Sequence, residues 1–261
     1  MNKKIAIIVI VAAIIAAAGI VVAMSGSDSE KYTIEYDGNG APGSTPDTKV
    51  PIGSTATISD NRFDKYQLHE FKCWNTKKDG SGTNYGPGAK LTPERSLTLY
   101  AQWTPFSILD CGVGSHTKTE ISGGSYYGST YYRYGGTEEM KVTAVSSKDY
   151  TASITTHATV TYDGKTENQD STSSVTVDRN TVYKGTRGTL DTPFGLKEVI
   201  IITETAKDVY GNTLTFTTYR DAETFIKYKD TMTAPKYYLN GYTFTNYSVT
   251  HTLVDFDIIK R

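Results

Sequence analysis

Cysteine and histidine are scarce in this chain, which limits the metal chemistry that it can support. The sequence has 261 residues, of which 2 are cysteine and 4 are histidine. Two cysteines cannot complete a structural zinc site alone, and the histidines lack the short fixed spacings of zinc ligands. The histidines stand at His69, His116, His157 and His251. The sequence therefore predicts no metal site.

Catalytic motifs are missing as well. No Gly-x-Ser-x-Gly sequence marks a nucleophile elbow, and the pair Glu138 and Glu139 cannot converge on one glycosidic bond, because neighbouring strand residues point to opposite faces. Residues 38–43 fit the glycine spacing of a dinucleotide-binding turn, yet Pro42 and Pro46 argue against the helix that such a turn requires. We therefore expect a protein that is not an enzyme and has no cofactor.

An excess of basic charge is also missing. The chain has 27 lysines and arginines against 28 aspartates and glutamates, and Lys3 and Lys4 belong to its extreme N-terminus. The remainder is mildly acidic, which argues against a nucleic-acid partner. The composition is instead rich in threonine, serine, glycine, valine and tyrosine, with 20 tyrosines. This mixture is typical of strands and turns, so the sequence predicts an all-β protein.

A long apolar run at the N-terminus predicts a membrane segment. Residues 5–24 carry no charge and are interrupted only by Gly19, which is about the length of a transmembrane helix. Lys3 and Lys4 precede the run, so the N-terminus is expected in the cytoplasm and the bulk of the chain outside. We interpret residues 1–24 as a single-pass anchor in the cell membrane. A cleaved signal peptide is the alternative, because small residues near Ala23 would suit a signal peptidase.

Residues 25–31 are polar and short and predict a linker, and a first module follows over residues 32–104. Its four characteristic blocks are Tyr-Thr-Ile-Glu-Tyr-Asp-Gly-Asn-Gly from Tyr32, Phe-Lys-Cys-Trp-Asn-Thr from Phe71, Asp-Gly-Ser-Gly-Thr-Asn-Tyr from Asp79 and Leu-Tyr-Ala-Gln-Trp from Leu99. In this order they resemble the Listeria/Bacteroides repeat of internalin-type surface proteins. The resemblance implies a β-grasp-like spacer or interaction module without catalytic residues. Cys73 departs from the glycine that usually precedes the tryptophan of this repeat.

Two side chains of this module are expected in its core, and two cysteines could link it to the rest of the chain. Trp74 and Trp103 each close an alternating strand on its apolar face, which predicts that both are buried. Cys73 and Cys111 form an even pair in an exported protein, which permits one disulfide. Two buried free thiols are the alternative, because spacing alone does not show that the Cα atoms are close enough.

Residues 105–261 predict a larger antiparallel sheet. Apolar and polar residues alternate over residues 150–162, with Tyr150 and Tyr162 on the dry face. Residues 172–184 are a candidate partner for this strand, and Gly211 and Asn212 separate the two halves of a further hairpin. The alternation changes phase near Thr245, which indicates a bulge. Long strands without a helical period predict one strongly curved sheet, either a half-barrel or a sandwich.

Five tyrosines between glycines form the one predicted interaction surface: Tyr126, Tyr127, Tyr131, Tyr132 and Tyr134. If they lie on one strand, Tyr127 and Tyr131 share one face, and Tyr132 and Tyr134 share the other with Tyr126. Tyr127 and Tyr131 are then the candidate patch, because exposed rings beside glycines can stack on a partner. Plain packing of these rings is the alternative.

These features favour a membrane-anchored surface protein that acts in adhesion or in interaction with a surface protein or a glycan. A half-barrel carrier of a lipid or another apolar ligand is the alternative. The interior of the second domain separates the two hypotheses. Large side chains that fill it would indicate a scaffold, whereas an apolar cavity of roughly several hundred Å³ would indicate a carrier.

Overall fold

A computed structural model describes residues 30–64, 66 and 68–261 of the chain. The predicted anchor, residues 1–24, and most of the predicted linker, residues 25–31, lie outside the described residues. The chain divides into two compact units. The first comprises the described residues up to Asp64 together with Phe71–Gln102, and the second comprises the segment ending at Glu70 together with Trp103–Arg261.

The described residues contain no helix with the length and apolar character needed to cross a membrane.

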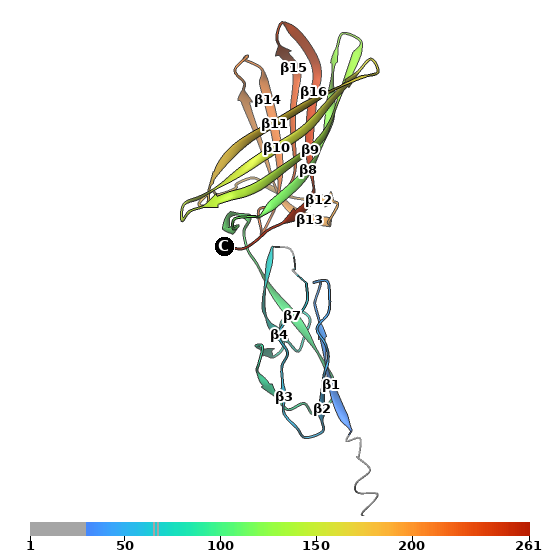
Figure 1. Cartoon of the computed structure of the whole chain (residues 1–261), viewed down its shortest axis with the longest axis vertical. Helices are drawn as coiled ribbons and strands as arrows, with labels where there is room; N and C mark the ends of the chain where they lie inside the picture. Colours follow the sequence, from blue (N-terminus) through green and yellow to red (C-terminus); the bar gives the residue numbers. More distant parts are fainter. Residues whose placement is uncertain (1–29, 65, 67) are drawn as a thin grey trace, which may run out of the picture. The chain divides into compact units, whose positions relative to one another are not determined.

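The first unit is built on a five-stranded sheet in the order β2-β1-β7-β4-β5 (Figure 1). Its central strands β1 and β7 are parallel, and β1 and β2 are antiparallel. A short antiparallel pair, β3 and β6, completes the unit. The strands are β1 (Lys31–Asp37), β2 (Thr48–Pro51), β3 (Ala56–Thr57), β4 (His69–Asn75), β5 (Asn84–Tyr85), β6 (Lys90–Leu91) and β7 (Leu97–Pro105).

Trp74 occupies the centre of this unit, as predicted. Its side chain is fully buried, and its ring lies within 4.7 to 6.2 Å of the ring centroids of Tyr36, Phe71 and Phe63. The indole N–H donates a 2.9 Å hydrogen bond to the carbonyl of Ser59, so burial leaves no polar group without a partner there. The core of the first unit is therefore filled by one large ring and its neighbours.

The prediction that Trp103 is also a core residue is wrong. Alternation along β7 does bury Leu99 and Ala101, but Trp103 is only half-buried. The first unit ends at Gln102, within β7, so Trp103 belongs to the second unit, where its ring lies 5.4 Å from that of Tyr66. The alternation along β7 predicted which face of the strand is buried, but it did not predict where along β7 the core of the first unit ends.

The glycine-rich segment after β1 is a turn, as expected. Asn39 has a φ of 50°, its backbone N–H donates to the Asp37 carboxylate at 2.7 Å, and its side-chain amide donates to the carbonyls of Lys78 and Ala101 at 3.0 and 2.9 Å. Asn residues tolerate this left-handed backbone, and the bond from the Asn39 side chain to Ala101 ties the end of β1 to β7.

The second unit is a single antiparallel sheet of nine strands in the order β11-β10-β9-β8-β16-β15-β14-β13-β12. Consecutive strands from β8 to β11 pair as hairpins, and so do consecutive strands from β12 to β16. The pairing of β16 with β8 joins these two halves of the sheet. The strands are β8 (His116–Tyr127), β9 (Thr130–Val145), β10 (Asp149–Tyr162), β11 (Lys165–Asp178), β12 (Thr186–Thr192), β13 (Gly195–Lys207), β14 (Thr213–Asp221), β15 (Lys227–Leu239) and β16 (Tyr242–Asp257).

The nine-stranded sheet is strongly curved, as the half-barrel prediction requires. In Figure 1, β10 and β11 cross in front of β14 and β15, and side chains from β11 and β15 line one hollow. Because all nine strands belong to one sheet, the predicted alternative of a two-sheet sandwich is not what the second unit adopts. The bulge predicted near Thr245 is confirmed by a register shift between Thr245 and Ser248, with Asn246 at a φ of 52°.

Two glycines permit close approach of strands in this sheet. A Cβ on Gly136 would lie 2.1 Å from the carbonyl oxygen of His157 on β10, and a Cβ on Gly123 would lie 2.1 Å from that of Ser248 on β16. A larger residue at either position would push the neighbouring backbone away. Two of the glycines that surround the tyrosine cluster in the sequence, Gly123 and Gly136, therefore serve the tight packing of strands.

A hydrophobic core occupies one part of the curved sheet. It includes Val142, Ala152, Val199, Leu253 and other buried residues, and it is covered by the 3-10 turn η1 (Ile108–Asp110). Burial of these apolar side chains supplies the main driving force for folding of the second unit.

Both cysteines are buried free thiols in the structure. Cys73 belongs to the first unit and Cys111 to the second, and the disulfide between them that the sequence permits is not formed. Burial raises the pKa of the Cys111 thiol to about 11. At neutral pH this side chain therefore stays protonated and unreactive.

Candidate ligand-binding cleft

The curved sheet of the second unit encloses a cleft of about 520 Å³. Side chains from six neighbouring strands line it, with β8, β9, β10 and β11 on one side and β15 and β16 on the other. Of the four β10 residues that line it, Ala158, Val160 and Tyr162 belong to the face predicted as dry, and Thr159 belongs to the other face. The cleft is therefore an apolar face that the fold leaves partly uncovered.

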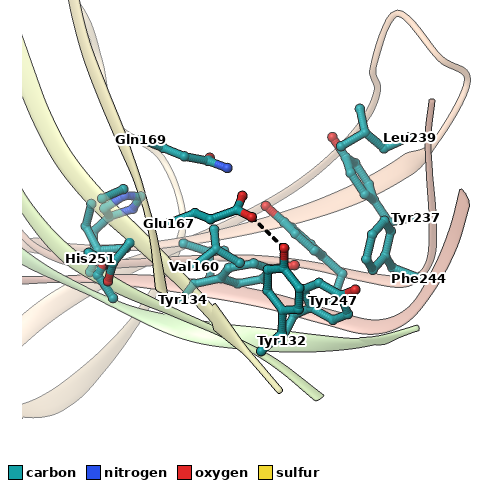
Figure 2. Close-up of a pocket in the computed structure, with 16 residues that line it drawn as sticks. Tyr132, Tyr134, Val160, Glu167, Gln169, Tyr237, Leu239, Phe244, Tyr247 and His251 are labelled. Carbon is teal, nitrogen blue, oxygen red and sulfur yellow. Dashed lines mark hydrogen bonds between the residues drawn. The ribbon is translucent and has the colours of Figure 1, made fainter. Parts of the chain in front are cut away.

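Six aromatic rings dominate the wall of the cleft (Figure 2). They are Tyr132, Tyr134, Tyr162, Tyr237, Phe244 and Tyr247. Tyr132 stacks on Tyr162 with a centroid distance of 4.7 Å and an interplanar angle of 21°, and Phe244 meets Tyr132 edge-on at 5.5 Å. The rings hold one another in fixed orientations, because such pairs are favourable beyond the area that they bury.

A second stacked pair lies on the β15 and β16 side of the cleft. The rings of Tyr237 and Tyr247 are 4.6 Å apart at an angle of 18°, and Tyr134 lies 5.7 Å from Tyr247. The hydroxyls of Tyr134 and Ser125 share a 2.6 Å hydrogen bond. Burial raises the pKa of both Tyr134 and Tyr247, so these phenols are neutral at physiological pH and can donate hydrogen bonds to a ligand.

Polar side chains also line the cleft, among them Glu167, Gln169 and His251. The Tyr162 hydroxyl donates to the Glu167 carboxylate, shown by the dashed line in Figure 2, and this hydrogen bond raises the pKa of Tyr162. Gln169 lies beside Glu167 on the same strand. Aromatic walls with a small number of polar groups are typical of sites that bind small molecules.

An ion cluster lies at the end of the cleft marked by His251 in Figure 2. The ring Nδ1 of His251 is 2.8 Å from the Asp230 carboxylate, which also pairs with the Lys227 ammonium. Burial opposes ionisation of Asp230, but the hydrogen bond with His251 and the charge of Lys227 prevail and lower its pKa to about 2. Asp230 is therefore a carboxylate at neutral pH, and the Lys227 ammonium balances its charge.

The two predicted patch residues, Tyr127 and Tyr131, do not share a face. The five tyrosines lie on two strands, because a turn at Gly128 and Ser129 separates β8 from β9. Tyr126 pairs with Tyr131 across the hairpin, with ring centroids 5.0 Å apart, so these two lie on the face opposite the cleft. The single-strand assumption behind the predicted grouping is wrong.

Tyr127 lies at the end of the cleft face instead. Its ring is 5.7 Å from that of Phe244, which lines the cleft, and 5.3 Å from that of Tyr242. Tyr127 and Tyr131 are 41% and 45% exposed, respectively, so each is accessible on its own face.

Several cleft residues were not singled out from the sequence as functional. The sequence predicted Tyr132 and Tyr134 as packing residues and Tyr162 as part of a dry face. It predicted no functional role for Tyr237, Phe244 or Tyr247. The available signal was the aromatic residue Tyr162 at the end of the face predicted as dry.

The first unit also has a surface hollow, of about 750 Å³. It is lined chiefly by consecutive residues from Leu91 to Thr98, and Tyr100 is the one aromatic ring among its lining residues. It lacks the opposed rings of the cleft, so we assign no site to it. Among the described residues, no group of three or more histidine, cysteine, aspartate or glutamate side chains is arranged to hold a metal ion.

Comparison with known proteins identifies the first unit. Residues 32–102 match the model of the Listeria-Bacteroides repeat domain. This segment is a Listeria-Bacteroides repeat domain. The match confirms the resemblance seen in the sequence blocks, and it accounts for less than a third of the chain.

A comparison with curated proteins extends into the second unit. Over 200 residues, or 71% of the chain, the sequence is 28% identical to a protein of Evansella cellulosilytica that is named "Putative membrane protein". The matched region covers 25% of that relative, so the chain spans about a quarter of its length. No solved structure matches the chain.

Proposed function

We propose that this chain is a membrane-anchored surface protein whose second unit binds an apolar ligand in the cleft. One observation carries the proposal: six aromatic rings from four strands surround about 520 Å³ of space on the curved sheet. Ligand sites typically enclose about 300 to 1,000 Å³ and are lined by apolar and aromatic side chains with few polar groups. This is the property by which a carrier differs from a scaffold with a filled interior.

The location is supported by the repeat domain, by the name of the Evansella relative and by the apolar run at residues 5–24. The proposal places the N-terminus in the cytoplasm and both units outside, with the repeat domain as a spacer. Carbonate washing of membranes tests the anchor. The chain is expected to stay in the membrane fraction, because an uncharged run of this length inserts effectively irreversibly. A soluble chain that starts near Met24 would contradict the anchor.

The wall chemistry indicates the kind of ligand. Stacked rings such as Tyr132 with Tyr162 offer flat apolar surfaces, and Val160 and Val249 add aliphatic surface between them. Phenol hydroxyls and Glu167 lie where a polar part of the ligand would meet water. The proposal is therefore a lipid or another apolar molecule, bound without catalysis and without a cofactor.

Native mass spectrometry of the full chain, purified from membranes, tests the proposal. The wild-type chain is expected to carry an additional mass that organic solvent extracts. A double variant, Tyr132→Ala with Phe244→Ala, should lose that mass, because it removes rings on both sides of the cleft. Tyr131→Ala is the matched control on the opposite face and should keep it. A wild-type chain without any additional mass, or an equal mass on the double variant, would refute the proposal.

Adhesion is a second candidate function, and a specific observation supports it. Tyr126 and Tyr131 form an exposed ring pair on the face opposite the cleft, where they could stack on a surface protein or a glycan. Substitution of both by serine should weaken attachment of cells that display the chain, while the mass bound in the cleft is unchanged. Unchanged attachment of that variant would leave ligand binding as the proposed function.

A further inference from the structure

A second hollow, of about 240 Å³, lies next to the core of the curved sheet. Apolar side chains such as Met140, Ile154 and Val175 form much of its wall. Three charged residues also line it: Glu138 on β9, Arg220 on β14 and Lys227 on β15. We call this hollow the inner pocket. Its combination of an apolar wall with fixed charges differs from the aromatic cleft.

Arg220 has unused donors at this pocket. One guanidinium nitrogen donates to the carbonyl of Phe225 at 2.9 Å, and the guanidinium carbon lies 4.1 Å from the centroid of the Tyr183 ring. Among the described residues, no carboxylate oxygen lies within 4.0 Å of its nitrogens. A guanidinium has five N–H donors and keeps its charge in proteins, so most of its hydrogen-bonding capacity remains available.

The surroundings make this charge costly. Burial lowers the pKa of Arg220, although the guanidinium stays charged at any physiological pH. A charge beside apolar walls is unfavourable unless an opposite charge pairs with it. Stacking on Tyr183 offsets a part of that cost. An anion that enters the pocket would satisfy both the charge and the free donors.

The other two charged residues of the pocket, Lys227 and Glu138, are less suited than Arg220 to pair with an anion. The Lys227 ammonium is paired with Asp230, which also pairs with His251. The Glu138 carboxylate accepts a 3.4 Å hydrogen bond from the Thr156 hydroxyl and would repel an anion. Arg220 is therefore the cation available to a ligand, and Glu138 limits how tightly an anion binds.

We propose that the inner pocket binds the carboxylate of an apolar acid, with Arg220 as its anchor. A planar guanidinium matches a carboxylate with two parallel N–H···O bonds, and the apolar wall accommodates the hydrocarbon part. The inference goes beyond the proposed function, because the inner pocket and the aromatic cleft share no lining residue and the inner pocket is a second site on the same sheet.

A matched pair of small probes tests this proposal on the full chain. Hexanoate and hexan-1-ol have the same chain length, and only the first carries a charge. Titration of the wild-type chain with each probe should show tighter binding of the acid. NMR of ¹³C-carboxyl hexanoate then measures the pKa of the bound carboxyl group. The pKa of the bound carboxyl should fall below that of free hexanoate, because the guanidinium stabilises the anion.

Three variants assign the effect to named groups. Arg220→Met should weaken hexanoate binding by about tenfold or more, as expected for a charged hydrogen bond, and leave hexan-1-ol unchanged. Arg220→Lys should restore a part of the affinity, because it keeps the charge but loses the fork of donors. Glu138→Gln should strengthen hexanoate binding, because it removes the repelling charge. Thermal melts of each variant verify that the second unit is folded.

The outcomes separate this inference from the proposed function. Equal binding of acid and alcohol by the wild-type chain, or full affinity for hexanoate in folded Arg220→Met, would overturn the inference. A wild-type chain that carries no extractable mass but still binds hexanoate would instead contradict the apolar-ligand proposal alone. If Arg220→Met does not fold, the comparison of the two probes on the wild-type chain still tests whether a carboxylate binds more tightly than an alcohol.

Discussion

The ring cluster of the repeat domain surrounds a buried side chain, whereas two stacked ring pairs of the second unit surround open space. In the repeat domain, Trp74 is fully buried among the rings of Tyr36, Phe63 and Phe71. In the second unit, the stacked pairs of Tyr132 with Tyr162 and of Tyr237 with Tyr247 stand around an unfilled cleft.

The difference teaches what each unit can do. Rings that fill a core add to stability and present no surface to a partner. Rings that remain half-exposed leave apolar area in contact with water, which a ligand can cover. This contrast supports the proposal of a spacer in one unit and a binding site in the other.

Removal of the buried tryptophan should give the largest effect on stability. Trp74→Ala is expected to cost the repeat domain about 3 to 5 kcal/mol, because it leaves a large cavity and an unpaired carbonyl at Ser59. Hydrogen exchange should then show loss of protection in β1 and β7 and retained protection in β8 to β16. Equal loss of protection in both units would break the comparison, since it would mean that they fold as one.

Loss of the ion cluster should give a smaller effect that depends on pH. The pKa of Asp230 is lowered from 3.8 to about 2 in the folded chain, so its ionisation stabilises the second unit above pH 4 and this contribution disappears as the pH falls towards 2. Asp230→Asn should reduce the free energy of unfolding by about 2 kcal/mol at neutral pH. Urea unfolding at pH 7 and at pH 2 measures this. A cost that is the same at both pH values would contradict the assigned pKa.

The exposed rings should give the smallest effect. Tyr127→Ser and Tyr131→Ser are each expected to change the free energy of unfolding by about 0.5 kcal/mol or less, because both side chains are more than 40% exposed. Thermal melts of the two single variants measure the change. A large destabilisation by Tyr131→Ser would show that the ring pair with Tyr126 is a structural contact, which would remove the basis of the adhesion candidate.

Local patterns in the sequence predicted much of the fold. Period-two alternation placed residues 150–162 in a strand, a phase change located the bulge at Thr245, and ordered blocks identified the repeat domain. Trp74 was predicted correctly because its strand, its core and its partners all belong to one short module. These features depend on neighbouring residues, so a single sequence contains them.

Other features depend on contacts between distant segments and were missed. The turn at Gly128 and Ser129 reversed the chain within the tyrosine cluster, so counting along one strand assigned Tyr127 and Tyr131 to the same face. The cleft joins residues that are more than 100 positions apart, such as Tyr132 and Tyr247. The cleft forms because β8 pairs with β16, and no local sequence pattern predicts this pairing.

The central claim is that the curved face of the second unit, and not its opposite face, is a ligand-binding surface. The most direct measurement is NMR of the full chain with ¹³C-labelled tyrosine rings during titration with hexan-1-ol. Resonances of Tyr132, Tyr134, Tyr237 and Tyr247, which line the cleft, are expected to shift, while those of Tyr126 and Tyr131 on the opposite face stay in place. Shifts confined to Tyr126 and Tyr131, or no shift of any tyrosine, would contradict the account.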